Sequence, residues 1–400
     1  TVEIFSKLSA EQKRVLSVLS IFREPVSIDA LSEQKLDIDV LDSLVEQGLA
    51  RQVDSEVYDV HDLIREFLLR SLDEKLKIEL HNKCSTWYQK ASDAPVFTIE
   101  LIFHLVSSDN MTEAAEIIVN TGRSLISQGH MELLGLIESL EQSELSENVS
   151  TKVNHYKGEI LALLGRFEDA KEAFRDAQES ANKSKDVNTQ AELLSALADI
   201  SLKQGNLDES LNMHRDALQI FIKLKDAIGA ARSYNNMGYI LRRKNDKSKA
   251  LESYSEVETI LQEHDDSELI GSQLILARSL MDLGEIERAR DHALEAFDKT
   301  DKLNDKQLHA RAQAVLGRYY AKVGDADVAS HHYSQALDAM NEEGDILAMV
   351  DITILLGEVL QDSGKNDEAM EHFREALVIA EANDLRMQIC LLYTSPSPRD

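Results

Sequence analysis

The sequence has few of the residues that stabilise small secreted proteins or that interrupt helices. Its two cysteines, Cys84 and Cys390, cannot build a disulfide framework, which favours a reducing, cytoplasmic setting. Only four prolines and 16 glycines occur in 400 residues, and aromatic residues make up 5% of the chain. Such a composition favours long helices. Because no run of 18 apolar residues occurs, the sequence excludes a transmembrane helix.

Basic residues are also scarce. Lysine and arginine number 43 against 72 aspartates and glutamates, which gives a formal net charge of −29. Phosphate contacts need concentrated Lys and Arg, so this charge opposes nucleic acid or an anionic membrane as the main partner.

The usual short motifs of enzymes are absent. The sequence has no G-x-x-x-x-G-K-[ST] loop to hold nucleotide phosphates, and no H-E-x-x-H, C-x-x-C or G-x-S-x-G. The adjacent residues His331 and His332 point in different directions on a helix and do not form a metal pair. We therefore expect no enzyme activity, no catalytic residue, no metal and no cofactor held by this chain alone.

What the sequence does have is a repeat with a period of about 40 residues. Small residues stand seven positions before and five positions after each turn. The turns, 39 or 40 residues apart, are at Gly165, Gly205, Asn245, Gly284, Gly324 and Gly364. Regular self-similarity of this length predicts a solenoid, an architecture that binds partners along its surface.

Each unit has the pattern of a helix, a tight turn and a second helix. Glycine permits the left-handed backbone of a helix end, and Asn245 is the residue type that best replaces it. Polar residues three positions after each turn are expected to accept hydrogen bonds from the start of the second helix. These are Glu168, Asp208, Ser248, Glu287, Asp327 and Asp367.

This pattern resembles the tetratricopeptide repeat, with a small residue in the first helix and a small-aromatic-small pattern in the second. The clearest matches are Gly158/Ala170/Phe174/Ala177, Gly238/Ala250/Tyr254, Gly317/Ala329/Tyr333/Ala336 and Gly357/Ala369/Phe373/Ala376. In two units the pattern is broken, because His214 and Ala293 stand where the second helix should have an aromatic residue. We expect six repeats and a truncated seventh over residues 149–389, and a non-native tail over residues 390–400.

Residues 1–72 do not follow the repeat. Ser9 and Gln12 predict a capping box before a first helix, and Pro25 and Ser27 predict the start of a second. A third helix precedes Gly48, and two strands follow as a hairpin. This order predicts a winged-helix domain. Its third helix carries Asp37, Asp39, Asp42 and Glu46 without Lys or Arg, so a DNA-binding regulator is a disfavoured alternative.

After the hairpin, Val60, His61 and Asp62 open another helix. A winged helix ending in such a motif and followed by repeats resembles the signal-transduction ATPases with numerous domains (STAND). The resemblance implies that His61 contacts the β-phosphate of bound ADP, beside Asp62. It also implies an ATPase domain before Thr1, through which such proteins assemble. The structural alternative is a packed His61 with Asp62 as helix N-cap. In the hydrophobic-His-Asp motif of that family the first residue is more usually Met, and Val60 stands in its place here.

Residues 73–148 show helical periodicity without the repeat, and we expect an irregular helical linker that caps the array. The whole chain is thus expected to be all-α, a solenoid preceded by a winged helix with a small β-wing.

The first helix of each unit should line the concave groove, where we expect a protein or acidic peptide to bind. The alternative is that the basic side chains of these helices only balance acidic side chains of neighbouring units. The candidate groove residues are Arg232, Asn235, Tyr239, Arg242, Arg278, Arg311, Arg318 and Lys322. The sequence favours the effector-sensing region of a multidomain signalling ATPase. The alternative is a stand-alone scaffold that binds partner peptides.

Overall fold

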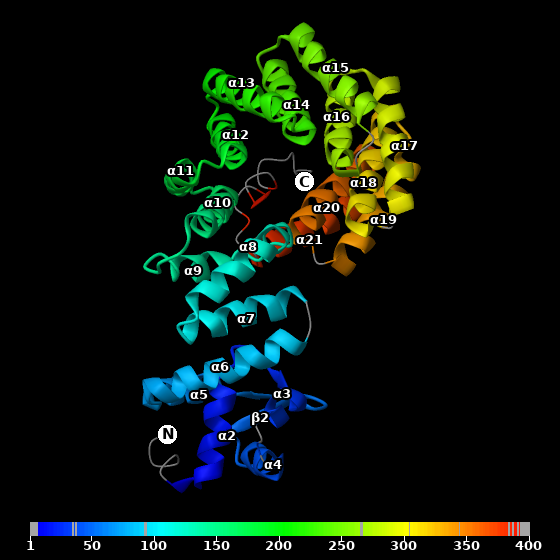
Figure 1. Cartoon of the computed structure of the whole chain (residues 1–400). Coiled ribbons are helices and arrows are strands. Elements are labelled where there is room, and N and C mark those ends of the chain that lie inside the picture. Colours follow the sequence, from blue (N-terminus) through cyan, green and yellow to red (C-terminus); the bar gives the residue numbers. More distant parts are fainter. Residues whose placement is uncertain are drawn as a thin grey trace. The chain divides into compact units, whose positions relative to one another are not determined.

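The structure is a computed structural model that describes residues 7–33, 36, 38–91, 94–264, 267–303, 305–343, 345–382, 385, 388–389 and 392. Asp37, Cys390 and all of the expected tail except Leu392 lie outside the described residues. The chain divides into two compact units (Figure 1). They are Thr1–Thr121 with Gly135–Leu145, and Gly122–Leu134 with Ser146–Asp400.

The first unit begins with helices and a small sheet. Its helices are α2 (Ala10–Ile21), α3 (Ile28–Glu33), α4 (Ile38–Glu46) and α5 (Asp62–Ser71). Its strands are β1 (Val26–Ser27), β2 (Ala50–Asp54) and β3 (Val57–Val60), antiparallel in the order β1-β3-β2. The helices α6 (Glu74–Ala91), α7 (Pro95–Ser107), α8 (Met111–Ser127) and α9 (Leu133–Glu138) follow.

Two local predictions for this unit are confirmed, and one strand was not predicted. The capping box is present, since Ser9 Oγ accepts from the backbone N–H of Gln12 at 3.1 Å and the Gln12 side chain accepts from that of Ser9 at 2.9 Å. The second helix, predicted to start after Pro25 and Ser27, is present as α3 over Ile28–Glu33, but strand β1 before it, in which Val26 pairs with Tyr58, was not predicted. Val26 is a buried β-branched residue, which suits a strand better than a helix.

The second unit contains six helical hairpins. The first helices are α10 (Glu147–Leu163), α12 (Val187–Lys203), α14 (Ala227–Arg243), α16 (Ile270–Leu283), α18 (Lys306–Val323) and α20 (Ile346–Asp362). The second helices are α11 (Phe167–Ser184), α13 (Leu207–Leu224), α15 (Lys247–Glu263), α17 (Ile286–Leu303), α19 (Ala326–Glu343) and α21 (Asn366–Ala382). A short 3-10 helix, η1 (Ser267–Leu269), precedes α16. The predicted helical solenoid is confirmed, and no described helix is both long and apolar enough to cross a membrane.

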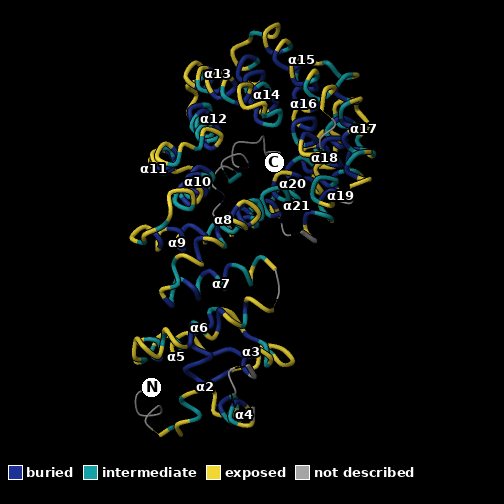
Figure 2. The backbone as a smooth tube through the Cα atoms, in the orientation of Figure 1, coloured by how far each residue is buried: buried dark blue, intermediate teal, exposed yellow. Residues whose placement is uncertain are grey.

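The turn residues and small residues act as predicted. All six turn residues have positive φ, including Asn245 at 61°. Gly158 faces the buried ring of Phe174 so closely that an added Cβ would lie 2.5 Å from Phe174 Cε1. The glycine therefore sets the close approach of the two helices, and buried positions recur along each helix where it meets its neighbours (Figure 2).

The predicted caps of the second helices differ from those in the structure. Glu168 and Asp208 lie in the first turn, two residues beyond the N-cap position, and bind Lys171 and Lys244 instead of capping the helix. The side-chain caps that recur are aspartates directly before a helix, at four of the first helices and also at the second helices α15 and α19, where Asp246 and Asp325 cap. Those of the first helices accept from the backbone N–H three residues on, at Asp186, Asp226, Asp305 and Asp345.

Candidate functional site

His61 and Asp62 lie at the start of α5, directly after β3. His61 is the N-cap residue, makes no side-chain cap bond, and is exposed. Asp62, expected in the structural alternative to be the N-cap, is instead the first residue of the helix, and its side chain is 90% exposed. The exposure of both residues argues against a packed His61. It leaves the imidazole at the positive end of a ten-residue helix.

The neighbouring strand is held by a carboxylate that the sequence analysis missed. Asp59 is 3% exposed and binds Arg51 at 2.5 Å on β2 and Arg65 on α5. Because Asp59 joins the sheet to α5, it fixes the start of the helix that carries His61.

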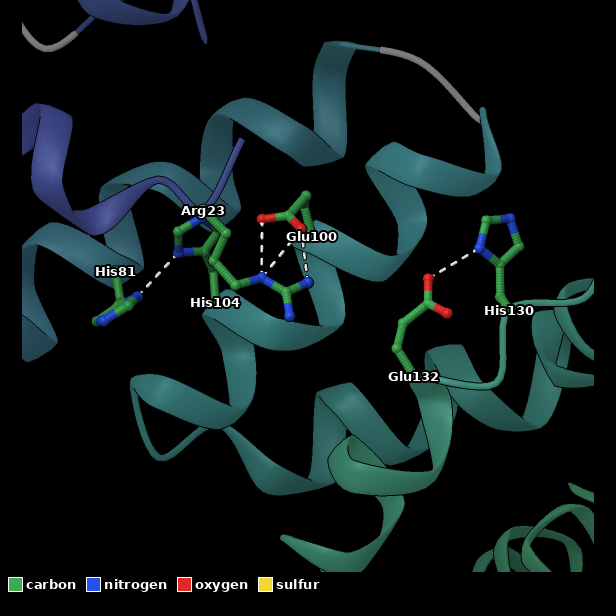
Figure 3. Close-up of polar contacts among 6 residues, drawn as sticks. All are labelled: Arg23, His81, Glu100, His104, His130 and Glu132. Atoms are coloured by element: carbon green, nitrogen blue, oxygen red, sulfur yellow. Dashed lines mark hydrogen bonds and ion pairs between the residues drawn. The ribbon is translucent and has the colours of Figure 1, made fainter. Parts of the chain in front are cut away.

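A separate buried cluster occupies the same unit (Figure 3). His81 Nδ1 on α6 lies 2.8 Å from His104 Nδ1 on α7, and both residues are buried. Arg23, after α2, forms a bond from Nε to Glu100 Oε1 of α7 at 3.0 Å. Burial lowers the pKa of His81 to about 4, and burial also lowers the pKa of His104 well below its usual value. These contacts join α2, α6 and α7 within the first unit.

In the second unit, His130 Nδ1 lies 2.9 Å from Glu132 Oε1, which joins the two residues of the turn before α9 (Figure 3). In the part of the chain that the structure describes, no three histidines, cysteines or carboxylates are grouped closely enough to hold a metal ion.

The second unit contains a cavity of about 770 Å³. Its lining in the repeats comes from α14, α16, α18 and α20 and the residues just before them, all on the first-helix side as predicted. The cavity is bounded on another side by Ser127. Close by, a Cβ on Gly129 would lie 3.0 Å from Ile346 Cβ at the start of α20. The repeats therefore curve until the sixth reaches the segment 122–134.

Four of the eight candidate groove residues line this cavity. They are Arg232, Arg278, Arg311 and Arg318. Arg311 approaches Asp345 at 3.5 Å, and Arg318 binds Asp282 at 2.9 Å.

The other four candidates do not line it. Asn235 is 1% exposed, and its amide donates to the Ser272 carbonyl at 3.0 Å, so it packs between repeats. Arg242 lies 3.4 Å from Asp282 and is 5.2 Å from the centre of the Tyr239 ring. Lys322 is exposed. Arg242, like Arg311 and Arg318, thus contacts an acid of a neighbouring repeat, as the alternative interpretation expected, whereas Asn235 bonds a backbone carbonyl instead.

Four acids of the same cavity were not among the predicted groove residues. Besides four arginines, its lining includes Glu268, Asp345, Asp351 and Glu358. Their signal was available, because Asp351 and Glu358 occupy the same positions in the sixth repeat as Arg311 and Arg318 in the fifth. The cavity is therefore of mixed charge rather than cationic.

Burial within the concavity disfavours several of these charges. Desolvation, followed by the nearby Arg318, lowers the pKa of Arg278. Desolvation also raises the pKa of Asp351 and of Glu358. Their side chains reach solvent, but the protein around them limits their hydration. Such groups gain from a counter-charge on a bound molecule.

Comparison with solved structures shows the same fold in proteins of low sequence identity. One is the STAND protein with a tetratricopeptide repeat sensor from Pyrococcus horikoshii, with 19% identity and a TM-score of 0.52. The similarity covers 98% of this chain, and the chain spans 60% of that protein's length. Another is aspartyl phosphate phosphatase F from Bacillus subtilis, at 10% identity and a TM-score of 0.50 over 93% and 94% of the two chains. Among curated proteins, no sequence matches significantly.

Models of the tetratricopeptide repeat match four segments of the sequence. These are residues 152–184, 189–263, 271–295 and 314–384, and together they make up just over half of the chain. With the glycine turns and six packed hairpins described above, these matches show that the chain belongs to the tetratricopeptide repeat family.

Proposed function

We propose that this chain is the effector-sensing and relay region of a multidomain signalling ATPase that acts in the cytoplasm. In this proposal the repeats bind a protein or peptide in the cavity, and the first unit transmits the change to a nucleotide-binding domain ahead of residue 1. The likeness to the Pyrococcus horikoshii STAND protein, over 98% of this chain, supports the proposal. ADP or ATP would be held only with that further domain.

The observation that carries the proposal is the setting of His61. It is exposed at the N-terminus of α5, on a strand-helix connection fixed by the Asp59 contacts with Arg51 and Arg65. A helix N-terminus favours phosphate, and an imidazole there can donate to a phosphate oxygen. The same residue is the one that the resemblance assigns to the β-phosphate of ADP.

The test uses the full-length protein from the natural reading frame. His61→Ala should release bound ADP about tenfold faster, because one hydrogen bond to a charged phosphate is lost. The exposed His264, far along the chain in the second unit, supplies the control His264→Ala, which should release ADP at the wild-type rate. Equal rates for the His61 variant and the wild type would contradict the assignment.

The stand-alone scaffold remains the alternative function. The upstream part of the natural reading frame distinguishes it from the sensing region of an ATPase. A natural frame without a phosphate-binding loop upstream would favour the scaffold. The DNA-binding alternative is not favoured, since the described part of α4 presents Asp39, Asp42 and Glu46 and no basic residue.

A further inference from the structure

Two positions of the first helices determine the charge of the concave surface. They lie six residues before and one residue after the small residue that packs against the second helix. From the first to the sixth repeat, the earlier position holds Lys152, Glu192, Arg232, Gly271, Arg311 and Asp351. The later position holds Glu159, Asp199, Tyr239, Arg278, Arg318 and Glu358. Both positions therefore change from basic in the fifth repeat to acidic in the sixth.

This reversal places two rows of opposite charge in one cavity. Arg311 and Arg318 are seven residues apart on α18, as are Asp351 and Glu358 on α20, and all four line the cavity. Seven residues correspond to about 10 Å along a helix, and packed helices lie about 8–10 Å apart. A cavity with such dimensions accommodates several residues of an extended chain rather than a single ion.

The two rows attract each other only across a distance, Asp351 toward Arg278 and Glu358 toward Arg318, without an ion pair between them. Arg318 binds Asp282 on α16, and Arg311 approaches Asp345, the residue before α20. Among the described residues, neither Arg278 nor Glu358 has an ion pair or a side-chain hydrogen bond. The free cavity thus retains one unpaired charge of each sign, on α16 and on α20.

Apolar side chains lie among these charges. The cavity lining includes Ile228, Leu274, Ile275, Val315, Ile352 and Leu355. An apolar lining with a few charged groups suits a peptide with apolar side chains next to charged ones. Phosphate-rich ligands are disfavoured, since Asp351 and Glu358 would repel them.

We propose that the cavity binds a dipolar peptide segment, whose acidic side chains face Arg278 and Arg311 and whose basic side chains face Asp351 and Glu358. This inference rests on the proposed sensing function and defines the ligand more closely than an acidic peptide. A wholly acidic peptide would satisfy the arginines but would meet the two carboxylates of α20. A dipolar segment satisfies both rows in only one orientation. The cavity would therefore bind the peptide with a single chain direction.

The test measures binding of four blocked hexapeptides to the 400-residue chain by calorimetry. The probes are EELLKK, with its reverse KKLLEE, the acidic EELLEE and the basic KKLLKK. We expect one dipolar order to bind at least about tenfold more tightly than either single-sign probe. Arg278→Glu and Glu358→Lys should each weaken that binding at least about tenfold, and Glu358→Lys should strengthen binding of EELLEE.

Matched controls keep the same change of net charge outside the cavity. Lys302→Glu and Glu371→Lys alter exposed residues of second helices that do not line it, and they should leave binding of the dipolar probe unchanged. Circular dichroism and thermal melting of every variant establish that the helices remain folded. A loss of binding with a wild-type helical signal then reports on the cavity itself.

Two outcomes would overturn the inference. In one, no dipolar probe binds at concentrations up to about 1 mM. In the other, EELLEE binds as tightly as the dipolar probes, and Glu358→Lys has no effect. The second result would leave an acidic-peptide sensor, and so the proposed function, intact. Failure of the sensing ATPase itself would appear independently, as unaltered ADP release in the His61→Ala full-length protein.

Discussion

Arg318 on α18 donates from Nη2 to Oδ1 of Asp282 on α16 at 2.9 Å. The other oxygen, Oδ2, lies 3.4 Å from Nη2 of Arg242 on α14. One carboxylate thus joins three successive repeats across their concave side. Because the three side chains are only 22–30% exposed, the contacts are partly shielded from solvent.

Replacing Asp282 should therefore lower the stability of the repeats. We expect Asp282→Asn to reduce the free energy of unfolding by about 1 kcal/mol, since two arginines lose their charged partner. Urea denaturation followed by circular dichroism measures the change. The control is Asp327→Asn, whose carboxylate is 94% exposed and 3.8 Å from Lys365, and it should change stability by less than about 0.5 kcal/mol. Equal effects of the two substitutions would contradict the shared role of Asp282.

The contact between Gly158 and Phe174 gives a second prediction. An added Cβ at Gly158 would lie 2.5 Å from the buried ring of Phe174, and closely packed helices cannot easily move apart. Gly158→Ala should therefore reduce the free energy of unfolding by about 1–3 kcal/mol, although alanine favours helix more than glycine does. Denaturant unfolding measures this loss as a lower midpoint for the variant, with the same dependence of the unfolding free energy on denaturant concentration as in the wild type.

Gly271 provides the matched control, because it is also a helical glycine in a first helix. A Cβ there meets no atom within 4 Å. Gly271→Ala should leave stability unchanged or raise it by up to about 1 kcal/mol, since only the helix preference changes. If both alanine variants behaved alike, close packing would not explain the recurrence of small residues before the turn.

The repeats were predictable because their signals are local and occur six times. A turn residue such as Asn245 has the same role in each hairpin, and a glycine-aromatic pair such as Gly158 and Phe174 recurs in four of the six. The charge of the cavity depends on the same register, and Asp351 and Glu358 would have been found by carrying the positions of Arg311 and Arg318 forward by 40 residues.

Other features could not be derived from spacing alone. Asn235 and Arg232 are three residues apart on α14, yet Asn235 packs against α16 while Arg232 lines the cavity. Only the crossing of neighbouring helices decides which of the two is covered. Strand β1 contains only two residues, so it exists through its pairing with β3 rather than through a pattern of its own. The exposure of His61 likewise depends on how α5 follows the sheet.

The buried pair of His81 and His104 predicts how stability depends on pH. Desolvation lowers the pKa of His81 to about 4, against about 6.5 in an unfolded chain. Above pH 6.5 the residue is neutral in both states and contributes no pH dependence. Between pH 6.5 and 4 the unfolded chain binds a proton that the folded chain does not, so stability falls by about 1.4 kcal/mol per pH unit. His104, whose pKa is also lowered, adds to the same decline.

The variant His81→Gln should isolate this contribution from that of the many carboxylates. Its stability at pH 7 can fall, because the contact with His104 Nδ1 at 2.8 Å is lost, but the slope is the informative quantity. From urea unfolding at pH 7, 6, 5 and 4.5, we expect its stability to decline less steeply than that of the wild type, by about 1.4 kcal/mol per pH unit at most. His264→Gln removes an exposed histidine and should run parallel to the wild type. Parallel curves for His81→Gln would mean that solvent reaches His81 in the folded protein and that its burial does not exclude the proton.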